Sequence, residues 1–165
     1  MLLRAVLSTS LACLGFWACG CSRETPEQLF AAGEAAVADT VSLDQAVASF
    51  NSLLQRFPEH ASCAGALKHL AAIAQQRRDM PGAIALYERL LAEYPKSEYC
   101  DEAQFMIGFI YEDELRDLER ARQAYQRVID SYPQSELAAS AQILLPNLGR
   151  SPEEWVKFQD LPSPP

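Results

Sequence analysis

The segment AIALYERLLAEYP, residues 83–95, decides the fold of this chain. Its outline is Ala-x3-aromatic-x6-aromatic-Pro, and the same outline recurs as AVASFNSLLQRFP at residues 46–58 and as ARQAYQRVIDSYP at residues 121–133. The three copies start 37 and 38 residues apart (83 − 46 and 121 − 83). A period of that length, filled with residues that favour helices, predicts a solenoid of stacked helix pairs.

The second copy shows why each copy is expected to be a helix. Its apolar residues fall at positions i, i+3, i+4, i+7, i+8 and i+11, which form one face of an α-helix. They are Ala83, Leu86, Tyr87, Leu90, Leu91 and Tyr94. The proline that follows ends the helix, because it restricts the residue before it and has no N–H to donate. We therefore expect each copy to be the second helix of a pair, with its aromatic side chains in the core.

The first helices of the pairs are expected between the prolines, over residues 61–77 and 98–112. The sequence TPEQ at residues 25–28 opens an earlier one, with a capping box and a proline at the first helical position. Small residues recur on these segments at Gly33, Ala71 and Gly108, which are 38 and 37 residues apart (71 − 33 and 108 − 71). A small side chain there lets the two helices of a pair approach closely.

The third copy and the helix before it resemble a tetratricopeptide repeat. The residues that carry the likeness are Ile107, Gly108, Tyr111, Ala121, Tyr125, Val128 and Pro133. The lengthened period, with YPKS at 94–97 and AQFMIG at 103–108, resembles one branch of that family. This branch contains the lipoprotein of the outer-membrane β-barrel assembly machine and the Tol-Pal-associated periplasmic protein.

The resemblance implies an all-α, right-handed α-solenoid of about three helix pairs. The pairs are expected at about residues 26–58, 61–95 and 98–133, with a capping helix at 136–145. The whole chain then divides into a leader (1–21), the solenoid (22–149) and a C-terminal segment (150–165). In that last segment Ser151-Pro152 opens a short helix with Trp155 and Phe158, before a Pro-rich tail.

The first 21 residues have the layout of a secretory signal. They contain no Asp or Glu, and Arg4 is followed by a mostly apolar run over residues 5–18 and then by small residues. The run is shorter than the about 20 residues that a membrane-spanning helix needs.

The end of this leader, Ala18-Cys19-Gly20-Cys21, resembles a bacterial lipobox. The resemblance implies that Cys21 is acylated and becomes the first residue of the mature protein. Cys19 is the alternative lipidated residue, and cleavage without a lipid or an uncleaved anchor also stays open. Ser22 is not the aspartate typical of inner-membrane retention, so the resemblance implies the outer membrane.

Composition and motifs exclude several classes of function. The 165 residues, 49% hydrophobic and 22% charged, suit one domain, and their net charge of −8 disfavours nucleic acid as a partner. We find no Gly-rich phosphate loop and no paired nucleophile and base, so we expect no enzyme, no cofactor and no small-molecule substrate. His60 and His69 are the only histidines and have no further ligand in pattern, so we expect no metal site.

Cys63 and Cys100 each follow a repeat proline by five residues (63 − 58 and 100 − 95). We expect small, semi-buried helix residues at these positions. A disulfide is the alternative, because the implied compartment is oxidising. Neighbouring helix axes lie about 8–10 Å apart, whereas a disulfide needs Cα atoms within about 7 Å, which favours free thiols.

The concave face of a tetratricopeptide solenoid binds partners, and the resemblance assigns first-helix residues to it. These groove residues are Phe30, Glu34, Lys68, Gln75, Phe105, Phe109 and Glu112, with Val37 and Ala72 at related positions. Aromatic side chains beside acidic ones would suit an extended segment with apolar and basic side chains. The alternative is that some of the phenylalanines pack against the next repeat.

These inferences combine into an expected function. The resemblance implies a non-catalytic scaffold: an outer-membrane lipoprotein that faces the periplasm and supports outer-membrane protein assembly or envelope maintenance. Its partners would be envelope proteins of the β-barrel assembly or Tol-Pal type. The alternative is a soluble periplasmic module that coordinates Tol-Pal, peptidoglycan or secretion machinery.

Overall fold

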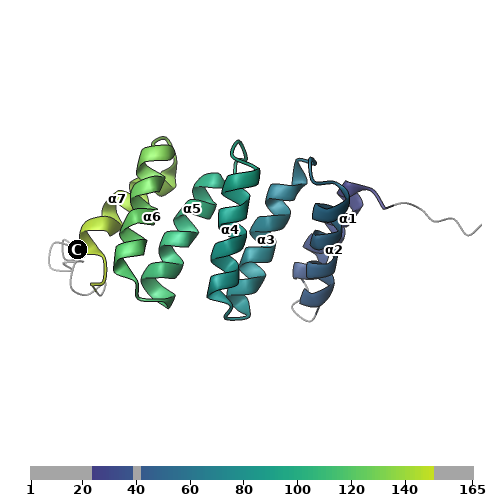
Figure 1. Cartoon of the computed structure of the whole chain (residues 1–165), viewed down its shortest axis with the longest axis horizontal. Coiled ribbons are helices and arrows are strands. Elements are labelled where there is room, and N and C mark those ends of the chain that lie inside the picture. Colours follow the sequence, from purple (N-terminus) through teal and green to yellow (C-terminus); the bar gives the residue numbers. More distant parts are fainter. Residues whose placement is uncertain (1–23, 39–41, 151–165) are drawn as a thin grey trace, which may run out of the picture.

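The computed structural model describes residues 24–38 and 42–150, and every element in this part of the chain is helical. Three pairs follow one another: α1 (Pro26–Ala38) with α2 (Leu43–Arg56), α3 (Ser62–Gln76) with α4 (Met80–Glu93), and α5 (Cys100–Phe109) with α6 (Leu118–Ser131). Helix α7 (Glu136–Leu144) and the 3-10 turn η2 (Leu145–Asn147) come last. Figure 1 shows the helices side by side in one row. The expected all-α solenoid is confirmed.

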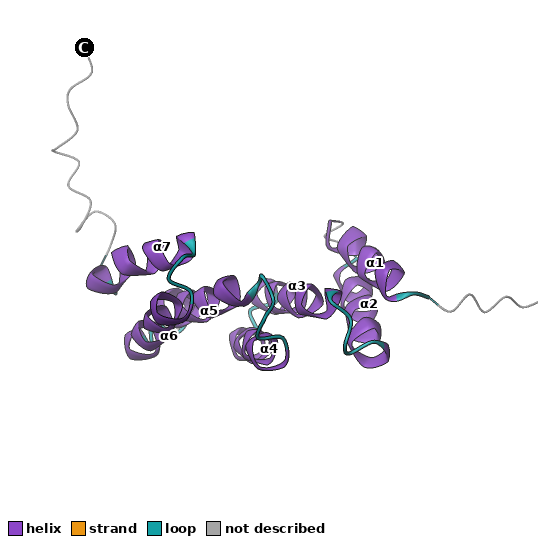
Figure 2. Ribbon diagram, turned by 90° about the horizontal axis from the view of Figure 1, so that it is seen from above, coloured by secondary structure: helices purple, strands orange, loops and turns teal. Residues whose placement is uncertain are grey.

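The helices form two layers, and each layer takes one helix from each pair. Figure 2 shows α1, α3, α5 and α7 on one side and α2, α4 and α6 on the other. The row curves gently, with the first helices of the pairs on its inner side (Figure 2). Each second helix also contacts the first helix of the next pair, and α7 packs on α6 as a cap.

The repeated alanine and the first repeated aromatic residue form the centre of each pair. Ala46, Ala83 and Ala121 are fully buried, and the rings of Phe50, Tyr87 and Tyr125 are buried beside them. The ring packs on the small residue of the first helix. A Cβ atom added to Gly33 would lie 2.4 Å from Cε1 of Phe50, and one added to Gly108 would lie 2.8 Å from Cδ1 of Tyr125. The predicted close approach at the small residues is confirmed for these two pairs.

The second aromatic residue of the pattern links one pair to the next. The Tyr94 hydroxyl donates a hydrogen bond to the Pro58 carbonyl of the preceding copy (2.7 Å). Phe57, Tyr94 and Tyr132 are partly buried and pack at the edge of the core. The turn after the first copy is therefore held by the second copy.

Cys63 and Cys100 also hold these turns. The Cys63 thiol donates to the Phe57 carbonyl (3.1 Å) and the Cys100 thiol donates to the Tyr94 carbonyl (3.3 Å). Both cysteines are buried and free. The structure thus decides between the two alternatives in favour of structural helix residues.

Helices α4 and α6 each begin with an aspartate N-cap that was not predicted from the sequence. Asp79 and Asp117 cap them, each accepting a hydrogen bond at 3.0 Å from the backbone N–H three residues on. The residues before these aspartates, Arg78 and Arg116, have positive φ angles of 62° and 56°. The Arg-Asp dipeptide, repeated 38 residues apart (116 − 78), therefore makes the sharp turn inside each of these pairs.

Helix α5 departs from the expected range of 98–112. A turn precedes it, in which Ser97 Oγ accepts a hydrogen bond from the Tyr99 N–H (3.2 Å), and the α-helix starts only at Cys100. After Phe109 the backbone widens into a π-helical turn, η1 (Ile110–Glu114). Such wide turns occur often at functional sites.

None of the described helices combines the length and apolar character needed to cross a membrane. The leader with Cys19 and Cys21, and the short helix expected around Trp155, lie outside the described residues.

Candidate partner-binding face

The inner face of the solenoid is made by α1, α3, α5 and α7 (Figure 2). The predicted groove residues lie on the first three of these helices and on η1. They form three columns, each with one residue from each pair. The columns contain Phe30, Lys68 and Phe105; Glu34, Ala72 and Phe109; and Val37, Gln75 and Glu112.

The first column packs against neighbouring helices. The Phe30 ring lies 5.8 Å from that of Phe50 and covers Gly65 of α3. The Lys68 ammonium lies 4.4 Å from the centre of the Tyr99 ring and 3.3 Å from the Glu102 carboxylate. Phe30 thus follows the alternative interpretation, in which some of the phenylalanines pack against the next repeat. Its ring contributes to the packing between the first two pairs.

Two residues of the third column accept hydrogen bonds from buried tyrosines of the second helices. The Tyr87 hydroxyl donates to Gln75 Oε1 (3.0 Å), and the Tyr125 hydroxyl donates to Glu112 Oε2 (2.9 Å). Burial raises the pKa of Tyr87 to about 12. Burial and the hydrogen bond to Glu112 also raise the pKa of Tyr125. The first pair has Phe50, without a hydroxyl, and apolar Val37 at the matching position, so donor and acceptor are absent together.

Removing these hydroxyls should test the structural role of the third column. Tyr125→Phe is expected to lower the free energy of unfolding by about 1.5 kcal/mol, and Tyr87→Phe by about 1 kcal/mol, because a bond to a carboxylate is stronger than one to a neutral amide. Urea unfolding followed by circular dichroism measures both. Phe50→Tyr is the matched control and should not stabilise the protein, since Val37 offers no acceptor. Equal stability of all four proteins would contradict this role.

The middle column is the accessible one. Glu34, Ala72 and Phe109 are all exposed, and the Phe109 side chain, 39% exposed, is among the most exposed large apolar residues in the described part of the chain. His69 lies beside this column, stacked on Phe50 with its ring centre at 5.2 Å. Burial lowers the pKa of His69, which favours the neutral imidazole. A partner on the inner face would therefore meet these three exposed side chains first.

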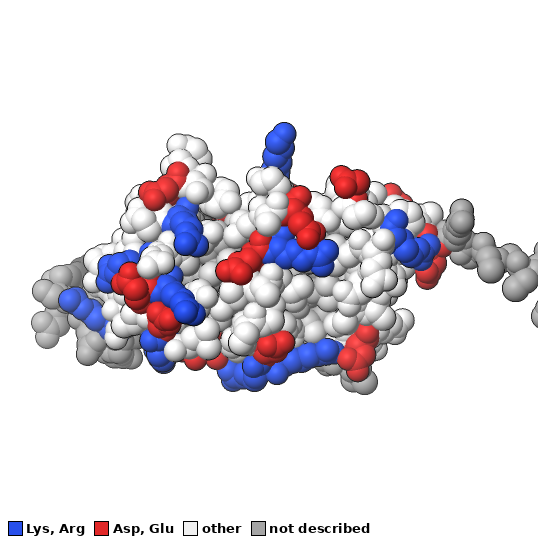
Figure 3. All heavy atoms as spheres, viewed as in Figure 1, with Lys and Arg blue, Asp and Glu red and all other residues white. Residues whose placement is uncertain are grey.

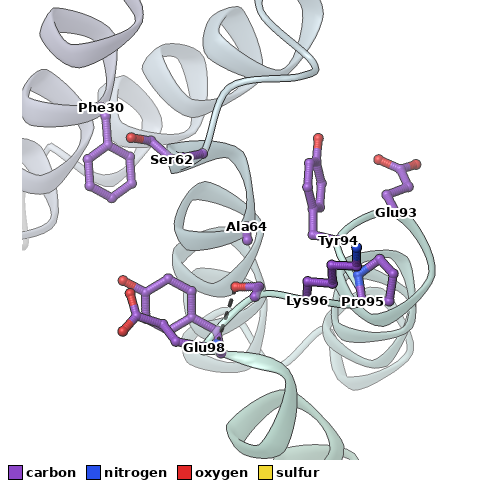
Figure 4. Close-up of a pocket in the computed structure, with 11 residues that line it drawn as sticks. Phe30, Ser62, Ala64, Glu93, Tyr94, Pro95, Lys96 and Glu98 are labelled. Atoms are coloured by element: carbon purple, nitrogen blue, oxygen red, sulfur yellow. Dashed lines mark hydrogen bonds between the residues drawn. The ribbon is translucent and has the colours of Figure 1, made fainter.

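A cavity of about 610 Å³ opens at the end of the inner layer where α3 starts. Figure 4 shows Phe30 on one side and Tyr94, Pro95 and Lys96 on the other, with Ser62 and Ala64 of α3 between them. Tyr99 also lines it, and this residue was not identified from the sequence. The cavity is apolar inside and carries Glu93, Lys96 and Glu98 in its lining, so it can take an apolar side chain.

A second cavity, of about 690 Å³, brings Phe105, Phe109 and Glu112 together. It lies between the α5–η1 segment and the residues that follow α7. Its other lining residues, Asp113, Arg116, Tyr125, Leu144, Asn147, Gly149 and Arg150, were not predicted for the groove. The predicted groove is thus divided: Phe30 lines one cavity, three residues line another, and Glu34, Lys68 and Gln75 line neither.

The outer face offers a contrast in charge. On the side that Figure 3 presents, basic and acidic side chains lie next to one another, and neither sign forms a continuous patch. Within residues 24–38 and 42–150, no three His, Cys, Asp or Glu side chains are placed to hold a metal ion. The two cavities with apolar lining residues are the features that suit a macromolecular partner.

Comparison with known proteins places this geometry in a family. A family model described as "YfiO: Outer membrane lipoprotein" matches residues 22–149, which include every repeat and the cap. The chain belongs to this family. The YfiO match confirms the resemblance to lipoproteins of the bacterial outer membrane and supports an envelope location for this chain.

A solved structure supports the fold independently. The N-terminal domain of stress-induced protein-1 (STI-1) from C. elegans superposes with a TM-score of 0.60 at 15% sequence identity, covering 72% of this chain and 93% of that chain. At this identity the likeness concerns the solenoid fold alone. No curated protein matches the chain in sequence.

Proposed function

We propose that this protein is a non-catalytic scaffold, anchored by an acylated Cys21 to the outer membrane and facing the periplasm. The observation that carries the proposal is the YfiO match, which begins at residue 22, directly after the lipobox-like cysteine. Only Ser22 and Arg23 separate Cys21 from the first described residue, Glu24. An anchor so near to α1 would keep the inner face close to the membrane.

The partners we propose are envelope proteins that assemble or maintain the outer membrane, of the β-barrel assembly type. A client segment would lie along the inner face as an extended chain, with apolar side chains in the cavity beside Phe30 and basic side chains near Glu34. The net charge supports a basic client: without residues 1–20 the chain loses one basic residue, leaving 13 basic against 22 acidic residues (14 − 1 and 22), or −9.

A second candidate function rests on one departure in the leader. The residue three before Cys21 is Ala18, where a lipobox usually has leucine. If the leader is cleaved without lipid attachment, the same solenoid would act as a soluble periplasmic module for Tol-Pal, peptidoglycan or secretion machinery. Membrane retention of the mature protein separates the two candidates.

Blocking the inner face without removing a contact tests the scaffold role. Ala72 is exposed at the middle of α3, so Ala72→Arg should fill the face while leaving the core intact. Recovery of β-barrel assembly proteins from cross-linked envelope membranes, measured by quantitative mass spectrometry, is expected to fall about tenfold, which corresponds to about 1.4 kcal/mol.

The matched control is Ala85→Arg, because Ala85 is also exposed but lies on α4 in the outer layer. This variant should recover the same proteins as the unmodified chain. Equal recovery with Ala72→Arg would show that partners do not bind the inner face. Loss with both variants would indicate a general effect of the added charge.

A further inference from the structure

The cavity between η1 and α7 has an apolar floor and a charged rim. Phe105, Phe109, Tyr125 and Leu144 supply the floor. The rim carries two acidic residues, Glu112 and Asp113, and two basic ones, Arg116 and Arg150. Phe109 is only partly covered, so a further apolar side chain could still be buried there.

The wall of this cavity is also the point where the described part of the chain ends. Asn147, Gly149 and Arg150 line it. The Arg150 N–H donates to the Asn147 carbonyl (3.0 Å), Leu148 has φ −49° and ψ 127°, and Gly149 has φ 76°. These values define a type II β-turn, in which glycine supplies the positive φ. Such a turn reverses the chain, so its direction at Arg150 opposes the direction in which α7 and η2 arrive.

The residues that follow have the composition to fill the cavity. They are SPEEWVKFQDLPSPP, residues 151–165, with large apolar side chains at Trp155 and Phe158. An extended chain covers about 3.3–3.6 Å per residue, so Trp155 can reach about 17 Å from Arg150. A tryptophan that enters an apolar site removes about 150–250 Å² from water.

We propose that residues 151–158 occupy this cavity, with Trp155 packed against Phe109. The charges favour this placement, because Glu153 and Glu154 would lie near the basic residues Arg116 and Arg150 of the rim. The occupant is this chain's own segment, because a short tether gives an effective concentration in the millimolar range, which a free partner must exceed.

Trp155 provides a direct readout. The chain has two tryptophans, so the Trp17→Phe form leaves Trp155 as the only one, whether or not the leader is cleaved. Acrylamide quenching of its fluorescence is expected to be about fivefold weaker than in a peptide of residues 151–165, because a docked ring is open to quencher only when the segment releases it. Quenching equal to that of the peptide would overturn the proposal.

Two variants locate the docking site. Phe109→Ala should raise the ratio of undocked to docked segment about fivefold, corresponding to the loss of about 1 kcal/mol from one aromatic pair. Ile143→Ala is the matched control, since Ile143 is 57% exposed on α7 and does not line the cavity. The double variant Glu153→Lys/Glu154→Lys changes two residues outside the solenoid. It should weaken docking, and the effect should be larger at low salt. No response to either change would refute docking in this cavity.

A dilution series separates this arrangement from association of two copies. Quenching that is independent of protein concentration is expected, because the segment and the cavity belong to one chain. Quenching that increases on dilution would show that the segment enters a second copy, which contradicts the proposal.

Discussion

Gly33→Ala is expected to lower the free energy of unfolding by about 2 kcal/mol, although alanine favours helices over glycine by about 1 kcal/mol. The new Cβ would lie 2.4 Å from Cε1 of Phe50. That ring cannot move aside, because it is fully buried, stacks on His69 and contacts Phe30. The helices of the first pair would have to separate. Urea unfolding followed by circular dichroism measures the change.

The second pair supplies the matched control. Ala71 occupies the place of Gly33 and already carries a methyl group, so Ala71→Gly should cost only about 1 kcal/mol, mainly from helix propensity. Combining Gly33→Ala with Phe50→Leu should remove much of the overpacking penalty, because the smaller side chain leaves room for the methyl group. A Gly33→Ala protein as stable as the unmodified chain would refute the close contact.

Cys21→Ala is expected to move the protein almost completely from the membrane to the soluble periplasmic fraction. The variant removes the cysteine that would carry the proposed lipid anchor. Buried acyl chains contribute about 0.8 kcal/mol per methylene, far more than a surface of net negative charge could gain from anionic lipids. Fractionation with metabolic palmitate labelling measures both retention and acylation.

Cys19→Ala is the matched control and should leave labelling and retention unchanged. Labelling that is lost with Cys19→Ala and kept with Cys21→Ala would move the anchor to Cys19. A chain that takes up no palmitate and is released from membranes with both cysteines present would favour the soluble module.

Most of the fold could be predicted from the sequence because its determinants are periodic. Three copies of one pattern gave the helices, their ends at proline and the buried aromatic residues, and the cap followed from the break after Leu145. The close approach of the paired helices was also predictable, since the small residues Gly33 and Gly108 follow the period of the repeated pattern. The helix pattern, the proline ends and the spacing of the small residues can all be read along the sequence, and each recurs in the repeats.

The candidate site was harder to predict because it depends on what neighbouring helices present. Gln75 and Glu112 lie at groove positions along their own helices, yet hydroxyls from the second helices engage both. A signal was present, because polar residues stand there only in the pairs that have tyrosine. The π-helical turn at Ile110–Glu114 and the cavity beside Arg116 arise from packing between α5, α6 and α7, which no single segment encodes.

The two thiols that hold the turns bear on survival during the export that we propose. Proteins that cross into an oxidising envelope meet enzymes that couple any reactive pair of cysteines, and thiolates are the species that react. Burial raises the pKa of both Cys63 and Cys100, so each stays protonated and hidden once the helices have formed. Folding itself thus shields the repeats from mispairing, and the chain can carry unpaired sulfur without becoming a substrate for thiol exchange.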